Sequence, residues 1–425
     1  MHTRNSAIKN VLISGAGFSN KGAQAMLFVT ASEVRKRYPD AKIYYTTRDS
    51  LTKKSGFLLH PLDKHTFINA FAMETKSLRP IKGFLSATKE AAISIIKRNW
   101  KAIYSEYRYR KLIKTIDLIL DISGYNLTSL FPVSTNEFYL KLIDCAGKSG
   151  IPIFLLPQSF GPFAYSSHKS PYISNMRQIL SYPNMIFARE SQGYNLLTNE
   201  LGLKNVVLSN DLVLQNREID WNLLFYPNEM PKASISISTE KNVGIIPNKN
   251  LITKCPHVSV FSLYEEIISF LLEKNKTVYL IYHSSEDYHI CKNIKKAFSH
   301  SSSVVLLRQE LNCYDYENII TNFDYVIASR FHSIVHSFKH NVPCLGLGWA
   351  EKYLTLFCSL DQQDYMFDMR AEHTTKEIMT CLQKLEQNYP SESKLIKDKL
   401  EIIQSENCFD IIFNELENKE STYET

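Results

Sequence analysis

Short runs of apolar residues alternate with helical patterns along most of this chain, and this rhythm constrains the fold more than any other feature. Val11–Ile13 is an apolar run closed by two glycines, and the residues after Asn20 repeat apolar side chains at helical spacing. Asn20 is well placed to cap that helix. A further apolar run, Ile43–Tyr45, follows. A strand, a helix and a second strand in this order predict a parallel sheet.

The same rhythm fills two stretches of the chain, separated by a polar segment at residues 216–241. Further runs that we interpret as strands are Ile116–Ile122, Ile151–Leu156, Met185–Ala188, Val206–Leu208, Val243–Ile246, Val278–Tyr282, Val304–Leu307, Tyr325–Ala328 and Cys344–Leu347. Near-continuous apolar runs are typical of parallel strands covered on both faces. We therefore expect an α/β protein with two doubly wound Rossmann-like domains, in a GT-B-like arrangement with the site in the interdomain cleft. The expected boundaries are residues 1–225, residues 235–373, and C-terminal helices with a tail over residues 374–425.

The composition excludes several classes of protein. Hydrophobic residues make up 44% and charged residues 22% of 425, which is the balance of a soluble globular chain. A net charge of +6 suits an anionic ligand but does not by itself indicate nucleic-acid binding. The eight cysteines form no C-x-x-C pair, as expected of thiols in a reducing compartment. Without a signal-peptide core or an apolar run near the ~20 residues of a membrane span, we expect a cytoplasmic protein.

Residues 76–114 of the first domain are strongly basic. They hold eleven lysines and arginines against Glu90 and Glu106, with Trp100 and several tyrosines interleaved. A basic amphipathic helix with aromatic residues can lie on an anionic membrane surface. This segment therefore predicts peripheral contact with the inner face of the plasma membrane, while a solvated helix packed on its own domain is an equally good interpretation.

The glycine turn after the first strand is a poor nucleotide site. Gly15-Ala16-Gly17 lacks the third glycine of G-x-G-x-x-G and the GK[ST] ending of a P-loop, and no acidic residue closes the second strand at Tyr45. We therefore expect neither NAD nor ATP as a cofactor.

Polar residues at the carboxyl ends of strands are better candidates, because open α/β sheets bind ligands there. Asp121 ends an apolar strand, and it either acts on a ligand or caps the turn that follows. Arg330 and His332 come directly after the strand Tyr325–Ala328. The arginine fork suits a carboxylate or a phosphate, and a helix N-terminus adds to the attraction for an anion. The alternative for Arg330 is a salt bridge between domains.

Two further strand ends carry candidates of the same kind. Arg189 stands at a strand-to-helix junction and would supply a third cationic group, unless it simply pairs with Glu190. His283 follows the strand Val278–Tyr282 and is a weaker candidate. No histidine, cysteine or carboxylate cluster stands at metal-ligand spacing in the sequence, so we expect a site without metal.

Taken in order, these motifs resemble the polysaccharide pyruvyl transferase family from about Val11 to Phe357. The matching segments are Asn20-Lys21-Gly22-Ala23, Asp121-Ile122-Ser123-Gly124, Pro157-Gln158-Ser159-Phe160-Gly161-Pro162, Arg189-Glu190-Ser191, Asp211, Ser329-Arg330-Phe331-His332, Pro343 and Lys352. No single motif is specific, but their order and spacing together are. The basic segment of residues 76–114 has no counterpart in this pattern.

The resemblance implies transfer of the enolpyruvyl group of phosphoenolpyruvate onto two hydroxyls of a sugar, forming a cyclic pyruvate ketal. The acceptor would be a surface polysaccharide, such as a capsule, an exopolysaccharide or a cell-wall glycan, or its lipid-linked precursor. The substrate-binding residues implied are Arg189, Arg330, Asn20, Gly124 and Lys352, to which we add His283 from its position. Asp121 and His332 would serve as base on the sugar hydroxyl and acid on the methylene carbon, and the two roles could be exchanged.

Two other classes of function remain open from the sequence. A GT-B nucleotide-sugar glycosyltransferase usually carries a carboxylate in the second domain to hold the donor, where this chain has Arg330 and His332. A non-enzymatic carbohydrate-binding protein would leave three basic groups at strand ends unexplained. No cofactor besides the phosphoenolpyruvate donor is expected.

Overall fold

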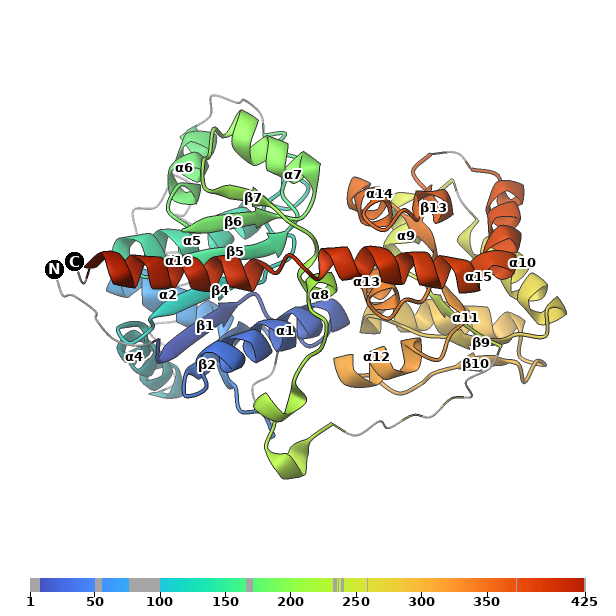
Figure 1. The fold of residues 1–425 in the computed structure, drawn as a ribbon, viewed down its shortest axis with the longest axis horizontal. Helices are drawn as coiled ribbons and strands as arrows, with labels where there is room; N and C mark the ends of the chain where they lie inside the picture. Colours follow the sequence, from blue (N-terminus) through green and yellow to red (C-terminus); the bar gives the residue numbers. More distant parts are fainter. Residues whose placement is uncertain are drawn as a thin grey trace.

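The computed structural model describes residues 8–49, 56–75, 100–165, 171–231, 235, 237, 241–257, 259–371 and 373–423. Within these ranges the chain forms two parallel sheets, each covered by helices, which lie side by side along the long axis of the molecule (Figure 1). The expected class of two doubly wound α/β domains is confirmed.

The first domain contains a seven-stranded sheet in the order β3-β2-β1-β4-β5-β6-β7, with every pair parallel. Its strands are β1 (Asn10–Ser14), β2 (Lys42–Thr47), β3 (His60–Asp63), β4 (Leu118–Asp121), β5 (Ile153–Gln158), β6 (Met185–Ala188) and β7 (Val206–Leu208). Its helices are α1 (Lys21–Arg37), α2 (Lys64–Glu74), α4 (Trp100–Ile113), α5 (Val133–Ser149), α6 (Pro171–Leu180), α7 (Ser191–Asn195) and α8 (Leu212–Gln215).

The second domain contains a six-stranded parallel sheet in the order β10-β9-β8-β11-β12-β13. Its strands are β8 (Asn242–Ile246), β9 (Thr277–Leu280), β10 (Val304–Leu306), β11 (Tyr325–Ala328), β12 (Cys344–Gly348) and β13 (Met366–Asp368). Its helices are α9 (Lys249–Lys254), α10 (Val260–Glu273), α11 (Tyr288–Ala297), α12 (Cys313–Ile320), α13 (Phe331–Lys339) and α14 (Glu351–Cys358).

Two strands were not expected from the sequence, and both lie at sheet edges. β3 contains Pro61, which has no N–H to donate and is tolerated in a strand at the edge of a sheet. β13 is three residues long and only partly buried. β3 reads His-Pro-Leu-Asp and β13 reads Met-Phe-Asp, so neither segment carries the apolar run that identified the other strands, including the edge strands β7 and β10.

The strand order positions a site between the domains. It reverses between β1 and β4 in the first sheet and between β8 and β11 in the second, and such switch points are where open α/β sheets bind ligands. Loops from the carboxyl ends of both sheets meet: Asn20 after β1 contacts His283 after β9, and Arg189 after β6 contacts Phe331 after β11.

Two helices at the C-terminus tie the domains together. α15 (Thr375–Ile403) runs along the second domain, and α16 (Cys408–Tyr423) returns across the first (Figure 1). The Cys408 N–H donates to Gln215 at 2.8 Å, and the ring of Phe413 packs edge-on against Tyr38 with centroids 5.6 Å apart. The chain therefore crosses between the domains twice.

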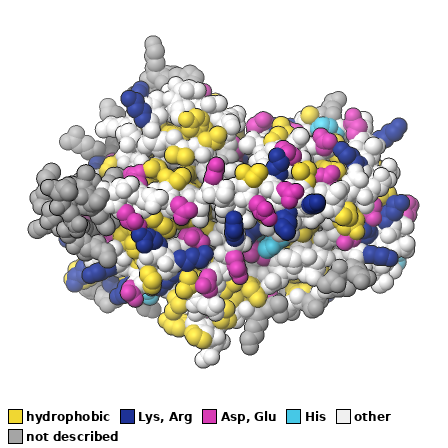
Figure 2. Space-filling model, viewed as in Figure 1, with side chains coloured by type: hydrophobic (Ala, Val, Ile, Leu, Met, Phe, Trp, Pro, Cys, Tyr) yellow, Lys and Arg dark blue, Asp and Glu magenta, His cyan; other side chains and the backbone are white. Residues whose placement is uncertain are grey.

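Most of the basic segment expected at a membrane, residues 76–99, lies outside the described residues. In and after α4, Arg110 and Lys114 both pair with Glu74 of α2 at 2.9 Å. On the face shown in Figure 2, the described basic and acidic side chains are intermingled. Within the described ranges, no helix is long and apolar enough to cross a membrane.

Candidate functional site

The N-terminus of α1 forms the contact between the domains. Asn20 caps this helix as expected, because its side-chain oxygen accepts the N–H groups of Gly22 and Ala23 at 2.9 and 3.2 Å. The same oxygen lies 3.3 Å from His283 Nε2 of the second domain. Gln24, one turn further on, accepts the N–H of Cys313 at 2.8 Å. The start of α1 is thus bonded to two loops of the second domain.

Gly22 allows His332 to approach this helix closely. A Cβ added at Gly22 would lie 2.1 Å from Cγ of His332, which is far inside van der Waals contact. The glycine of the Asn-x-Gly-Ala motif is therefore required by the imidazole that packs on it.

His283 is held by hydrogen bonds on both of its ring nitrogens. The Asn20 oxygen is an acceptor, so His283 Nε2 donates to it, and Nδ1 then accepts from Ser333 Oγ at 3.0 Å. Ser333 in turn accepts from Tyr316 at 2.8 Å. Burial, reinforced by the charge of Arg330, holds the pKa of His283 well below its usual value. His283 is therefore a neutral link between the domains.

His332 presents an imidazole nitrogen that has no hydrogen-bond partner among the described residues. Its Nε2 is buried and lies 3.9 Å from Asp211, beyond hydrogen-bonding distance. Burial, then the nearby charges of Arg189, His336 and Lys352, hold the pKa of His332 well below its usual value. The side chain is therefore neutral at pH 7, with an unpaired nitrogen at the domain interface.

Arg189 is buried in a network on the first-domain side. Its guanidinium donates to Ser159 at 2.8 and 3.0 Å, to Glu190 at 3.0 Å and to Asp211 at 3.0 Å. Arg189 therefore pairs with Glu190, as the alternative interpretation of the sequence proposed, and it also pairs with the carboxylate of Asp211. A guanidinium carries five N–H donors, so it can bond to an anion while keeping these contacts.

The ring of Phe331 brings Arg189 and Lys352 together. The guanidinium carbon of Arg189 lies 4.4 Å from the ring centroid, and Lys352 Nζ lies 5.1 Å from it. Lys352 Nζ also lies 4.9 Å from the ring of Tyr125, which belongs to the first domain, and 5.7 Å from that of Trp349. Aromatic faces attract cations, so these rings hold the ammonium in place without neutralising it.

Burial lowers the pKa of Lys352 to about 7, and the neighbouring charge of Arg189 acts in the same direction. A small cavity of about 30 Å³ adjoins this side chain. It is lined by Arg189, Glu190, Asn210, Asp211, Leu214, Phe331, Lys352, Thr355, Leu356 and Ser359. Glu190 and Asp211 carry two formal negative charges against the single positive charge of Arg189, so the positive charge that an anionic ligand can gain comes mainly from protonation of Lys352.

Arg330 is bound within the second domain rather than directed at this cavity. It donates to both oxygens of Asp287 at 2.8 Å and to Glu286 at 2.5 Å. Asp287 is fully buried and also accepts the N–H of Lys249 at 2.9 Å. The salt bridge considered from the sequence therefore exists, but it joins the loops after β8, β9 and β11 instead of the two domains.

Asp121 is saturated with hydrogen bonds inside the first domain. It accepts from the hydroxyls of Ser14 and Ser123, from the Ser123 N–H at 3.2 Å and from Gln158 at 3.3 Å, and it is 1% exposed. Asp121 therefore caps the turn that follows β4, which was one of the two interpretations of this residue from the sequence. Gly124, with φ of 73°, takes a left-handed conformation in the same turn.

The structure adds functional candidates that the sequence did not indicate. The Lys64 ammonium, at the start of α2, is close enough to Asp121 for their charges to interact, and burial lowers its pKa. Lys64 follows β3, and because β3 was not recognised as a strand, its position at the sheet edge could not be inferred. Phe331 and Tyr125 were likewise visible in the sequence without any sign that they surround a lysine.

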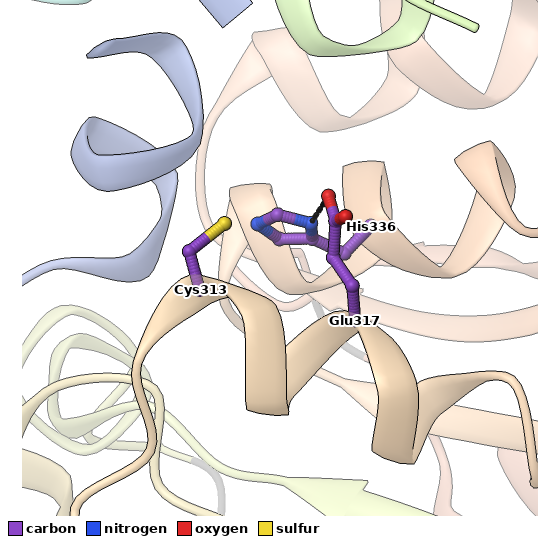
Figure 3. A group of neighbouring side chains, drawn as sticks. All are labelled: Cys313, Glu317 and His336. Carbon is purple, nitrogen blue, oxygen red and sulfur yellow. Dashed lines mark hydrogen bonds and ion pairs between the residues drawn. The ribbon is translucent and has the colours of Figure 1, made fainter. Parts of the chain in front are cut away.

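Among the described residues, Cys313, Glu317 and His336 have side-chain ligand atoms within 4.8 Å of one another (Figure 3). Glu317 lies 3.1 Å from His336 Nδ1 and from Lys339 Nζ. Burial acts to raise the pKa of Glu317, but Lys339 and His336 outweigh it and hold the pKa well below the usual value. Lys339 already supplies the cation that a metal would bring, so these residues fit a buried ion-pair cluster better than a metal site.

The interdomain contact therefore brings together Arg189, His332 and Lys352. Asn20 and His283 support them from the α1 side. Asp121 and Gly124 belong to a turn in the first domain, and Arg330 organises loops of the second.

Comparisons with known proteins agree with this arrangement. Residues 20–351 match the family model for polysaccharide pyruvyl transferase. Similar solved structures include a UDP-GlcNAc 2-epimerase from Neisseria meningitidis bound to UDP-GlcNAc, at 13% identity and TM-score 0.54, covering 96% of this chain and 100% of that one. A glycosyltransferase from Rickettsia africae has 8% identity and TM-score 0.50, covering 98% and 99%. Identities this low show the fold alone, and they confirm the GT-B-like arrangement. A search of curated proteins gave no match.

The pairing of Arg330 with a buried carboxylate predicts a loss of stability on mutation. Arg330→Gln leaves Asp287 charged and buried without its partner, which costs about 3–5 kcal/mol. Arg370→Gln is the matched control, because its ion pair with Asp368 is half exposed and contributes at most about 1 kcal/mol. Urea denaturation measures the free energy of unfolding of both variants and of the wild type. Equal unfolding free energies for the two variants would contradict the assigned role of Arg330.

Proposed function

The chain belongs to the polysaccharide pyruvyl transferase family, and from that premise we propose that it transfers the enolpyruvyl group of phosphoenolpyruvate onto a sugar, forming a cyclic ketal. The observation that carries the proposal is the grouping of Arg189 and Lys352 on the Phe331 ring, beside the unpaired Nε2 of His332. Phosphoenolpyruvate is a compact anion that carries a carboxylate and a phosphate. Its reaction needs cationic contacts for those groups and one residue that moves protons.

Lys352 is proposed to bind the phosphate of the donor. Its ammonium is partly deprotonated near pH 7 in the empty site, and a bound phosphate restores the proton, because an opposite charge favours the charged form. Arg189 is proposed to contact the donor carboxylate through donors that its existing network leaves available. The charge that develops on the departing phosphate is stabilised by the same cations.

The proton balance of the reaction suits a single neutral histidine. Two sugar hydroxyls lose protons, the methylene carbon of the donor gains one, and phosphate leaves with the other. His332 is neutral, so it can take the proton of the first hydroxyl as that oxygen attacks C2 of the enolpyruvyl group. The imidazolium delivers this proton to the methylene carbon in the same step, so that C2 has cationic character as the new C2–O bond forms. We therefore assign to His332 both the removal of the proton from the first hydroxyl and its delivery to the methylene carbon.

Asp121 is proposed to act from a distance. It was expected as one of the two proton-transfer groups, but its oxygens accept hydrogen bonds from three side chains and it is 1% exposed. Its proposed task is to fix the turn at Ser123 and Gly124, which adjoins Tyr125 on the wall facing Lys352. Arg330, held by Asp287, is proposed to position His332 two residues further on.

A nucleotide-sugar glycosyltransferase is the alternative that the fold permits. The similar structure from Neisseria meningitidis holds UDP-GlcNAc. In this chain the group at the second-domain strand end is His332, with Lys352 beside it and no carboxylate of that domain lining the cavity described. A compact anionic donor fits this set better than a ribose and a base.

The acceptor is proposed to be a surface polysaccharide or its lipid-linked precursor. A lipid-linked acceptor would give the basic residues of the segment 76–114 a partner at the cytoplasmic face of a membrane.

The lowered pKa of Lys352 predicts that donor affinity depends on pH. Above pH 7 the free enzyme must take up a proton to bind the donor, while the donor phosphate is already fully ionised. The dissociation constant should therefore rise by up to about tenfold per pH unit from pH 7 to 9. Lys352→Arg stays charged over this range and should flatten the profile. Isothermal titration with phosphoenolpyruvate measures the constants.

Lys384→Gln is the control for that titration, because Lys384 also lies over an aromatic ring, that of Tyr365, at a distance from the cavity. It should retain the wild-type profile, while Lys352→Gln should lose most donor affinity at pH 6. A wild-type affinity that does not change between pH 7 and 9, or wild-type binding by Lys352→Gln, would contradict the assignment.

We further expect turnover without a metal ion. Lys352 at the phosphate and Arg189 at the carboxylate supply the donor with positive charge that a divalent cation would otherwise supply. Activity measured as phosphate release should be unchanged after exhaustive dialysis against a chelator. Loss of turnover that returns on adding Mg²⁺ or Mn²⁺ would show that the cationic account is incomplete.

A further inference from the structure

A groove adjoins the Lys352 cavity and opens to the surface between the domains. Its volume is about 450 Å³, and its walls come from the end of β7, from α14, and from the connection between α15 and α16 with the start of α16. Four residues line both the cavity and the groove: Arg189, Asn210, Thr355 and Ser359. The two spaces are therefore adjacent, and we call the end of the groove at these shared residues its inner end.

The groove differs chemically from the cavity. Its lining is mostly uncharged, with hydroxyl and amide groups from Ser191, Ser209, Asn210, Thr355 and Ser359. Leu208 and Ile411 on the outer part are 50% and 41% exposed. The charged members are Arg189 at the inner end and Glu406, which is exposed. The cavity, by contrast, holds Arg189, Glu190, Asp211 and Lys352.

We propose that this groove binds the acceptor as a chain of neutral hexoses, with the reacting hydroxyl pair at the inner end beside Arg189 and Lys352. The inference rests on the proposed function, because it identifies the acceptor subsite of that reaction. Hydroxyl and amide side chains both donate and accept hydrogen bonds, as sugar hydroxyls do. The C–H faces of the sugar rings pack on the exposed apolar side chains of Leu208 and Ile411.

Other occupants fit the groove less well. A second anionic ligand would find few cations along it. A nucleotide base binds by stacking on aromatic side chains, and none of the residues described along the groove is aromatic. A glycan that lies here touches both domains and the start of α16, so the C-terminal helices become part of the acceptor site as well as a brace.

A cysteine on α14 reports directly on occupancy of the groove. Cys358 lines it and is exposed, Cys381 is partly buried, and the other six cysteines are buried. In a Cys381→Ser variant, the rate of alkylation by a maleimide therefore measures the accessibility of Cys358. The probes are neutral trisaccharides of glucose, galactose, mannose and their N-acetylated forms. At least one should slow alkylation by about fivefold at a concentration four times its dissociation constant, and phosphoenolpyruvate alone should not.

If no trisaccharide protects Cys358, or if phosphoenolpyruvate alone protects it, the acceptor assignment is overturned. The rise in melting temperature with phosphoenolpyruvate is recorded on the same samples. If the melting temperature does not rise, phosphoenolpyruvate is not the donor. Protection of Cys358 by a saccharide in the absence of phosphoenolpyruvate tests the groove independently of the donor. The two proposals can therefore fail separately.

Filling the groove provides the second test. Cys358→Trp should raise the KM for the protecting saccharide by about tenfold or more, while leaving the melting-temperature rise with phosphoenolpyruvate unchanged. Leu354→Trp is the matched control, because Leu354 is 40% exposed on the same helix and does not line the groove. Equal KM values for the two variants would overturn the proposal.

Discussion

The contact of the α1 N-terminus with the second domain is the interaction on which the rest of the site depends. Asn20 caps the helix and at the same time accepts a hydrogen bond from His283, while Gly22 makes room for His332. A larger side chain at Gly22 would separate the imidazole from the helix and, with it, the strand-end loops of the two sheets. Because Tyr125 and Arg189 come from one domain and Phe331 and Lys352 from the other, the cation pair forms only when this contact is closed.

Burial sets the chemistry of the charged groups in different ways. The charges of Arg330 and Asp287 compensate each other, so this pair fixes backbone loops and has little charge to offer a ligand. Lys352 faces aromatic rings instead of a bonded carboxylate, and its pKa falls to about 7 as a result of burial. His332 is driven to the neutral form by the same burial. Lys352, whose charge is withheld in the empty site, can gain charge in response to an anionic ligand, whereas the charge of Arg330 is already compensated by its carboxylates.

The central strands were predictable because both faces of a parallel strand are covered, which requires continuous apolar runs such as that of β4. The strands β3 and β13 are short and contain polar residues, so they lack such a run, and missing β3 also concealed Lys64. At the site, Arg189 and His332 were candidates from their places at strand ends, and Lys352 was a candidate from the family resemblance alone. Asp287 could be noted at a strand end, but its pairing with Arg330 could not be predicted, since the two residues are 43 positions apart in the sequence. The roles of Phe331 and Tyr125 depend on packing between domains, which sequence spacing does not encode.

The central claim is that this interdomain site consumes a compact anionic donor in the presence of a sugar. Phosphorus NMR of one reaction mixture containing phosphoenolpyruvate, a UDP-sugar and a neutral glycan acceptor tests it most directly. The account predicts that the phosphoenolpyruvate signal is converted to inorganic phosphate only when the acceptor is present, with the UDP-sugar unchanged. Conversion of the UDP-sugar while phosphoenolpyruvate persists would contradict it.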